Sequence, residues 1–336
     1  MTQPKVSVIL PVYNAGKYLH KCVQSLLAQT LQEIEIIVVL DCPTDGSDKV
    51  IREYAAKNER IKVIENSENL RAGLSRNAGM DAASGEYIGF CDHDDYVATD
   101  MFEQMYNTAV KTDANMVVCD INSVDSDGIL RKQVKFPMNS SGEALKDVLL
   151  KAAVRMYTPK DTGYGKSIWN VLFRKTFLDE NKLCFDDNKT ITAEDCLLLS
   201  KAYFLTDKVV HCPSVAGLYF HVGYQGSTYT SYAWLNVRLV INYAYNLYDF
   251  YSDRSISKQH EKYLAEGTLR HLYTGFLREL KHKSKKEALS TIKLIRNDKT
   301  IHTILKPLWS FDGLKYTITN IPPTKLFFLI VVSSRR

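Results

Sequence analysis

The chain has 336 residues, of which 45% are hydrophobic and 24% are charged, and its formal net charge is +5. This length allows one to three domains, and the composition is that of a soluble protein with a buried core. The mild positive charge does not indicate a nucleic-acid partner.

The seven cysteines are scattered, and no two of them form a C-x-x-C pair. This pattern predicts free thiols in a reducing cytoplasm. The first residues, Met1-Thr-Gln-Pro-Lys5, lack the apolar segment of a signal peptide. No apolar run reaches the ~18–20 residues that span a bilayer. We therefore expect a cytoplasmic globular protein, with peripheral contact to the cytoplasmic face of the inner membrane as an option.

The first hundred residues alternate between short aliphatic runs and segments of helical periodicity. Strands are expected over 5–12, 35–40, 61–64 and 85–91, and helices over 17–29, 47–57 and 73–83. Such alternation is typical of βαβ units on a parallel sheet. The fold class is therefore α/β, Rossmann-like, with a mostly parallel central sheet flanked by helices.

The next segment continues this unit to about residue 228. It is expected to contain helices over 100–111, 143–154 and 193–204, strands over 116–120 and 215–221, and a hairpin within 121–140 that turns at Asp125–Gly128. From about 232 the pattern becomes helical over 232–252, 256–282 and 284–297. We expect an α/β domain over 1–228, with one half over 1–95 and the other over 96–228, and a helical subdomain over 229–336.

The C-terminal end carries a seven-residue apolar run, 326–332, between basic residues. The run is too short to cross a membrane, but it could insert in the membrane interface. Packing on the core is the alternative, and the sequence leaves both open, together with self-association of this subdomain.

Three carboxylates follow the strand at 85–91: Asp92, Asp94 and Asp95. Ligands of open α/β sheets bind at the carboxyl ends of the strands, and clustered acids repel one another unless a cation is present. The cluster therefore predicts a site for a hard divalent metal, Mn²⁺ or Mg²⁺. A solvated acidic turn is the alternative, and Asp95 could instead cap the following helix.

Two residues at the ends of earlier strands suit a nucleotide. The ring of Tyr13 can stack on a flat base, although it could also be a core aromatic. The carboxylate of Asp41 can accept the imide N–H of uracil and would disfavour cytosine, whose corresponding ring nitrogen is an acceptor.

The order and spacing of five motifs carry a joint signal that none carries alone. They are Pro11-Val-Tyr-Asn14, Asp41-x-x-x-Asp45, Arg76-Asn77, Asp92-x-Asp94 and Glu194-Asp195. Together they resemble the family 2 inverting glycosyltransferases with the GT-A fold, over residues 5–95 most closely and up to 221. The resemblance implies that 1–228 is a GT-A catalytic domain, with a nucleotide-sugar-binding half (1–95) and an acceptor-binding half (96–228), followed by the helical subdomain.

The resemblance also implies roles on the donor side. Pro11, Tyr13 and Asp41 would bind the base, and Asn69 and Arg76 would line the nucleotide site. Arg76 could pair with the diphosphate, position the acids or form a structural salt bridge. Asp92 would hold the ribose or share the metal, and Asp94 would ligate it.

On the acceptor side, the resemblance makes Asp195 the general base, with Glu194 beside it; the alternative is two acids that complement a helix dipole. Trp169 could contact the acceptor sugar or belong to the core. His221, at a strand end, could reach the diphosphate or the metal or be structural.

Three positions depart from the family pattern. Leu40 stands where an acid often precedes Asp41, Pro43 replaces a serine, and His93 separates the acids where a small residue is common. The first two affect details of the donor site, and the third leaves the carboxylates intact.

The expected activity is metal-dependent, inverting transfer from a UDP-sugar to a hydroxyl of a glycan or lipid-linked acceptor, in the synthesis of a cell-surface polysaccharide. One alternative is a sugar nucleotidyltransferase, but the segment 11–16 contains one glycine and does not resemble a phosphate-binding loop. The other is a catalytically silent nucleotide-binding protein that kept the fold. The sequence leaves the sugar, the acceptor and the oligomeric state open, with a homo-oligomer as an option.

Overall fold

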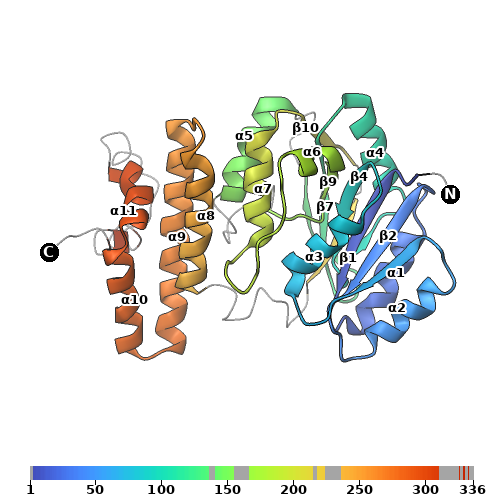
Figure 1. Cartoon of the computed structure of the whole chain (residues 1–336), viewed down its shortest axis with the longest axis horizontal. Coiled ribbons are helices and arrows are strands. Elements are labelled where there is room, and N and C mark those ends of the chain that lie inside the picture. The colour runs from blue at the N-terminus through green and yellow to red at the C-terminus, as the bar shows by residue number, and fades with distance from the viewer. Residues whose placement is uncertain are drawn as a thin grey trace.

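The computed structural model describes residues 3–135, 141–154, 166–214, 218–223 and 236–309, together with Lys325, Phe328, Leu329 and Val332. Figure 1 shows an α/β part that contains the N-terminus and a helical part at the opposite end of the molecule. This confirms the α/β class and the helical C-terminal region.

The main sheet has seven strands in the order β10-β6-β9-β4-β1-β2-β3. Their bounds are β1 (Val6–Val12), β2 (Ile34–Leu40), β3 (Ile61–Glu65), β4 (Tyr87–Phe90), β6 (Met116–Cys119), β9 (Val171–Arg174) and β10 (Val209–Cys212). All pairs are parallel except those of β9, which runs antiparallel to β4 and β6. Every residue of β1 and β2 is buried, because helices cover both faces of the sheet, and this explains their nearly continuous aliphatic sequences.

The helices of the α/β part follow the expected order. They are α1 (Leu19–Leu27), preceded by the 3₁₀ turn η1 (Gly16–Tyr18), α2 (Ser47–Ala55), α3 (Arg71–Ala82), α4 (Met101–Thr112), α5 (Gly142–Val154), α6 (Lys175–Glu180) and α7 (Glu194–Leu205). Each helix predicted for this part is present, and its ends lie within two residues of the prediction. Helix α6 was not predicted.

A smaller sheet, in the order β5-β11-β7-β8, lies beyond the carboxyl end of β4. It consists of β5 (Tyr96–Val97), β7 (Ile121–Asp125), β8 (Leu130–Val134) and β11 (Tyr219–Gly223). The predicted hairpin is confirmed as β7 and β8. The described part of the predicted strand 215–221 is β11, which starts at Tyr219, and β10 was not predicted.

The C-terminal helices are α8 (Val237–Ser252), α9 (Lys258–His282), α10 (Lys285–Asn297) and α11 (Lys299–Leu305), followed by the 3₁₀ turn η4 (Lys306–Trp309). Side chains cap each of the four helices at its first turn: Asn236, Ser257, Ser284 and Asp298. Figure 1 shows α8 and α9 beside α7, with α10 and α11 outermost.

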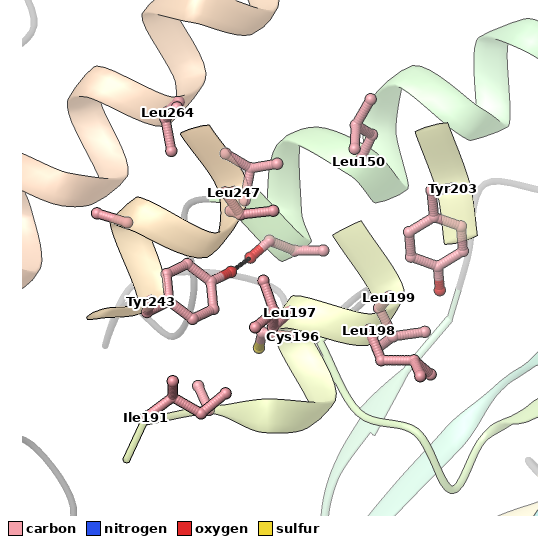
Figure 2. Packing of buried hydrophobic residues seen from close by; sticks show 14 of the residues in the cluster. Leu150, Ile191, Cys196, Leu197, Leu198, Leu199, Tyr203, Tyr243, Leu247 and Leu264 are labelled. Atoms are coloured by element: carbon pink, nitrogen blue, oxygen red, sulfur yellow. Dashed lines mark hydrogen bonds between the residues drawn. The ribbon is translucent and has the colours of Figure 1, made fainter. Parts of the chain in front are cut away.

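One hydrophobic cluster runs from the main sheet into these helices. It includes Ile9 on β1, Leu198 on α7, Leu247 on α8 and Leu264 on α9. Figure 2 shows where α5, α7 and α8 meet, and the Tyr243 hydroxyl there donates a hydrogen bond to the carbonyl of Ala153 (3.2 Å). The α/β part and the helical part thus share a core, and the expected division of the chain into domains stays a prediction.

The described part of the C-terminal apolar run belongs to this core. Phe328, Leu329 and Val332 are buried, and the ring of Phe328 packs on Tyr273 and Phe276 of α9. These three residues therefore fit core packing; the rest of the run lies outside the described residues.

The sequence predicts free thiols and no segment that spans a membrane. All seven cysteines are free. Among the described residues, no helix combines the length and the apolar character that a membrane span requires.

Candidate active site

The acidic cluster lies at the carboxyl end of β4, in the middle of the main sheet. Carboxylate oxygens of Asp92, Asp94 and Asp95 lie within 4.8 Å of one another. Hard oxygen ligands at this spacing suit Mg²⁺ or Mn²⁺, which take only one or two carboxylates when phosphates and waters supply the other ligands. The donor set therefore fits the expected metal.

The three carboxylates have different surroundings. In the part of the chain that the structure describes, no hydrogen-bond donor contacts the side chain of Asp94, which is half-buried. Asp92 accepts a hydrogen bond from Arg76 (2.8 Å). Asp94 is thus the acid most available to a cation.

Asp95 is buried and holds the small sheet against the site. Its carboxylate accepts hydrogen bonds from the Tyr219 hydroxyl (2.9 Å) and the Val222 amide (2.7 Å) and pairs with Nδ1 of His221 (3.1 Å). The helix that follows, α4, has Asp100 at its N-cap, so the interpretation of Asp95 as a helix cap is wrong.

The pKa values of Asp95 and His221 are both raised, but for different reasons. Burial raises the pKa of Asp95 to about 6, against the opposing hydrogen bond from His221. Burial would lower the pKa of His221, but the hydrogen bond to Asp95 and the surrounding carboxylates raise it to about 9. Near pH 7 the pair is therefore an imidazolium and a carboxylate, with Nε2 of His221 directed away from Asp95.

Trp169 joins this group through aromatic stacking. Its ring stacks on Tyr219 (4.1 Å between centroids) and lies nearly parallel to the ring of His221 (5.5 Å). Trp169 precedes β9, and because β9 runs antiparallel to β4, its beginning lies at the carboxyl end of β4. The antiparallel strand thus places Trp169 beside the acids.

Arg76 on α3 connects the acidic cluster with the start of α7. Its guanidinium is buried and donates to Asp92 and to Glu194 (3.1 Å). Burial would lower the pKa of Arg76, but Asp92, Glu194 and Asp195 raise it. Arg76 therefore remains charged, and of the options that the sequence leaves open, positioning the acids fits this geometry best.

Glu194 and Asp195 form the first turn of α7. Ala193, just before them, adopts a left-handed backbone (φ 51°), which turns the chain into the helix. Glu194 is buried against Arg76, whereas Asp195 is half-buried and accepts a hydrogen bond from the amide of Cys196 (2.8 Å). Both acids therefore lie near Asp92, although about 100 residues separate them in sequence.

The loops after β1 and β2 form the neighbouring wall. The Asn14 side chain accepts a hydrogen bond from the Thr44 amide (2.7 Å), and Asp45 accepts one from the Gly16 amide (2.9 Å). The Tyr13 side chain is 46% exposed at this wall, so it is not the core aromatic of the alternative reading. The ring of Tyr13 can therefore meet a ligand.

Pro11, at the end of β1, connects this wall with the acidic loop. Its carbonyl oxygen lies 3.2 Å from Nδ1 of His93. The histidine that departs from the family pattern thus links the β1 end to the loop that carries Asp92 and Asp94.

Asp41 is buried at the end of β2 and has several partners. Its carboxylate accepts hydrogen bonds from the amides of Leu70 (2.7 Å) and Arg71 (2.8 Å) and from the side chain of Asn66 (2.7 Å). The Asn69 side chain donates to the Asp41 carbonyl (3.3 Å). Asp41 thus shapes the turn before α3, and its role toward a base stays a prediction.

Helix α3 also contacts the loop before α7, which the sequence did not reveal. The Gly73 amide donates to the Asn188 side chain (2.7 Å), and the Asn77 side chain exchanges two hydrogen bonds with the backbone of Phe185 (both 2.8 Å). Arg76-Asn77 was recognised as a motif, but the partners 185–188 lie over 100 residues away in a loop with no motif of its own.

Comparison with known proteins agrees with this architecture. Residues 7–177 match the glycosyl transferase family 2 domain. The chain is 34% identical over 187 residues to the uncharacterized glycosyltransferase EpsJ of Bacillus subtilis (55% of this chain, 52% of EpsJ). It is 30% identical over 208 residues to the poly(ribitol-phosphate) beta-glucosyltransferase of Bacillus spizizenii (61% of this chain, 30% of that protein).

Among solved structures, residues 1–349 of S. aureus TarS in complex with UDP-GlcNAc superpose with a TM-score of 0.69 at 22% identity, covering 98% of this chain and 91% of that one. This likeness shows a GT-A fold. The fold and the acidic site define a GT-A protein. The chain belongs to glycosyl transferase family 2. It spans about half the length of the first curated relatives that it matches.

Proposed function

We propose that this chain is an inverting, metal-dependent glycosyltransferase that moves a sugar from a UDP-sugar to a hydroxyl of a glycan or lipid-linked acceptor. The observation that carries the proposal is the Arg76 bridge, because it brings the metal-type acids after β4 next to the acids that begin α7. One site then holds both acids that can bind a cation beside the leaving diphosphate and a separate carboxylate that can take the proton of the acceptor hydroxyl.

On the donor side, the exposed ring of Tyr13 offers a stacking surface for uracil, and Asp41, Pro11 and Asn69 shape the adjoining wall. Asp41 keeps lone pairs beyond the three hydrogen bonds that it accepts, since two carboxylate oxygens offer about four acceptor sites. A contact with the imide N–H of uracil is therefore compatible with its structural role.

Asp94, with Asp92, would hold Mn²⁺ or Mg²⁺. When bound, the cation offsets the charge that grows on the departing diphosphate. Asp95 holds the His221 ring through Nδ1, which leaves Nε2 to contact the diphosphate or the cation.

Asp195 would act as the general base. In a direct displacement the acceptor hydroxyl attacks the anomeric carbon from the side opposite the diphosphate, and a carboxylate takes the hydroxyl proton. The C–O bond to the diphosphate breaks as the new C–O bond forms, so the anomeric configuration inverts. Glu194, fixed on Arg76, orients the first turn of α7, and Trp169 offers an apolar face to the acceptor sugar.

The relatives support a cell-surface polysaccharide as the product. One of them is named for glucosyl transfer to poly(ribitol phosphate), and TarS was solved with UDP-GlcNAc. An enzyme of polysaccharide synthesis would draw its sugar nucleotides from the cytoplasm. We propose that this chain is peripheral to the inner membrane, and self-association would be compatible with this position.

The test is a donor panel. UDP- and GDP-sugars are incubated with the purified chain in Mn²⁺ or in EDTA, and release of the nucleoside diphosphate is measured. We expect slow hydrolysis of one or a few UDP-sugars that requires the metal. Release of pyrophosphate from a nucleoside triphosphate and a sugar phosphate, without diphosphate release, would instead identify a nucleotidyltransferase.

A further inference from the structure

Two neighbouring strands leave the main sheet and continue into the small sheet. Strands β6 and β10 pair in parallel in the main sheet, and the strands that follow them, β7 and β11, pair in parallel in the small sheet. Asp120 is the single residue between β6 and β7, whereas the crossing from β10 to β11 takes residues 213–218. Asp120 therefore marks the point at which the first of the two strands passes from one sheet to the other.

Asp120 contacts both ends of the second crossing. Its carboxylate lies 2.9 Å from Nε2 of His211, on β10, and accepts a hydrogen bond from the Ser214 amide (3.4 Å). Its carbonyl accepts hydrogen bonds from the amides of Leu218 (3.1 Å) and Tyr219 (3.4 Å), where β11 begins. One residue thus connects β10 with the beginning of β11.

The residue before Asp120 anchors Trp169 to the same point of the chain. The Cys119 amide donates to the Asn170 carbonyl, and the Asn170 side chain donates to the Cys119 carbonyl (both 3.0 Å). Asn170 is buried and follows Trp169 directly. The two rings that stack at the site, Trp169 and Tyr219, are therefore anchored at two successive residues.

The side chains of Asp120 and His211 are deeply buried, with 3% and 1% of their surface exposed. Burying two ionisable groups costs free energy, and replacing such a pair with apolar residues of similar size often leaves stability unchanged. Stability alone therefore does not explain the pair. Its place, between a strand and the crossing that follows it, points to a role in geometry.

We propose that the hydrogen bond between Asp120 and His211 positions β11, and thereby Tyr219 and His221, for the transfer reaction. Asp120 and His211 are positioning residues, because their buried side chains act on the site through β11 and not through contact with a substrate. This inference rests on the proposed function for its effect on turnover. The placement of Tyr219 beside Trp169, however, can be measured without any substrate.

The contacts of β11 explain why a small displacement of this strand matters. The Tyr219 hydroxyl donates to Asp95 (2.9 Å) and accepts from the Asp92 amide (3.1 Å), and His221 pairs with Asp95. A shift of β11 would therefore move the acidic loop and the His221 ring together. A misplacement of about 1 Å near reacting groups can cost on the order of 10²-fold in rate.

The first test replaces the pair with apolar side chains, in an apolar variant that combines Asp120→Leu with His211→Leu. Its kcat should fall at least about tenfold, while its melting temperature stays near that of the wild type. Turnover is measured as release of nucleoside diphosphate from the donor, per folded molecule, with the folded fraction taken from circular dichroism. A kcat equal to that of the wild type would overturn the proposal.

A second pair of variants keeps position 211 polar, so that the test does not depend on the folding of the apolar variant. His211→Gln retains an N–H group that can reach Asp120, whereas the side chain in His211→Asn is one carbon shorter and cannot. We expect a kcat near the wild-type value in His211→Gln and a loss of at least about tenfold in His211→Asn. Equal kcat in these two variants would contradict the proposal.

The fluorescence of Trp169 tests the placement of β11 without a substrate. The chain has three tryptophans, so Trp234→Phe with Trp309→Phe leaves Trp169 as the reporter. Because its ring stacks on Tyr219, the apolar variant should change its emission. Unchanged emission would overturn the proposal even if kcat fell. A wild type that releases no diphosphate from any donor would instead contradict the proposed function, and the emission would still test the placement.

The matched control replaces a buried polar pair far from the site. Thr291 on α10 donates a hydrogen bond to Glu279 on α9, at the far end of the molecule from the main sheet (Figure 1). Glu279→Leu with Thr291→Leu should keep the wild-type kcat per folded molecule and the wild-type emission of Trp169. A loss of kcat in the control equal to that in the apolar variant would mean that turnover responds to the loss of any buried polar pair, and the proposal would be wrong.

Discussion

At the scale of single residues, the proposed mechanism assigns cation binding and proton transfer to different residues. Asp92 and Asp94 follow β4, whereas Asp195 lies on the first turn of α7, and Arg76 holds the two groups together. Arg76 donates hydrogen bonds to Asp92 and Glu194, whereas the Asp195 carboxylate accepts one from the Cys196 amide. This division is what the proposed mechanism requires.

Asp195→Asn should lower kcat about 10²- to 10⁴-fold, because the amide cannot accept the proton of the acceptor hydroxyl. Binding of UDP should change little, since the donor wall is elsewhere. Transfer is measured by UDP release and binding by calorimetry. Asp179→Asn, on the exposed side of α6, is the control, and equal kcat in the two variants would remove Asp195 as the base.

Glu35 lies at the opposite end of the sheet from the site, and its ionisation should make the free energy of unfolding depend on pH. Burial would raise its pKa, but the Lys62 ion pair and hydrogen bonds from Ser7 and Ser84 outweigh burial and lower it below 4.5. A group with a depressed pKa stabilises the fold above its unfolded pKa, and the contribution is lost as pH falls through the folded pKa.

We therefore expect Glu35→Gln to cost about 1–3 kcal/mol of unfolding free energy at pH 7. The difference from the wild type should be constant above about pH 5 and shrink below pH 4.5. Urea unfolding across pH 3–8 measures it. A difference that grows toward acid pH would contradict this account of Glu35.

At the scale of elements, α3 positions both halves of the site. A Cβ added at Gly73 would lie 2.7 Å from the Asn188 side chain and from the Asp186 carbonyl, and 3.1 Å from Cγ of Glu194. Gly73 thus permits the loop before α7 to approach α3 closely. Arg76, one turn later on the same helix, then reaches Glu194.

Gly73→Ala should therefore displace the 186–194 loop and lower kcat at least about tenfold, as small misplacements near reacting groups do. Gly79→Ala on the same helix is the matched control, because its Cβ would meet Ile9 in the core and not the site. The control should lose stability but keep its kcat per folded molecule. Comparable kcat losses in both would show that α3 acts only through overall stability.

The sequence predicted the elements that periodicity defines and the acids that motifs define. Strands β1 and β2 were evident because they are buried and their sequences are nearly continuous runs of aliphatic residues. The antiparallel direction of β9 was not predictable, because a four-residue strand carries no sign of its direction, and this direction places Trp169 at the site. The contacts of Asp95 with β11 were also hidden, since 124 residues separate Asp95 from Tyr219.

At the scale of the whole molecule, the helical part and the catalytic part share one hydrophobic core. The buried cluster extends from β1 through α7 to α8, α9 and the described residues of the C-terminal run. Domains that unfold independently have separate cores. The shared core predicts that the two parts unfold together.

Calorimetric melting of the full chain should show a single transition with equal calorimetric and van't Hoff enthalpies. Leu247→Ala, in the shared core, should lower the melting temperature of that transition without splitting it, at a cost of about 2–5 kcal/mol. Two resolved transitions in the wild type would instead mean that the helical subdomain is an independent unit.

The central claim is that Asp94 and its neighbours bind a nucleoside diphosphate through a divalent metal. Titration calorimetry of UDP tests it in Mn²⁺ and in EDTA, with the wild type and Asp94→Asn; Asp48→Asn, on α2 outside the acidic cluster, is the control. The account predicts that UDP binds the wild type and the control in Mn²⁺, and that binding weakens at least about tenfold in EDTA or in Asp94→Asn. Equal UDP affinity under all these conditions would contradict it.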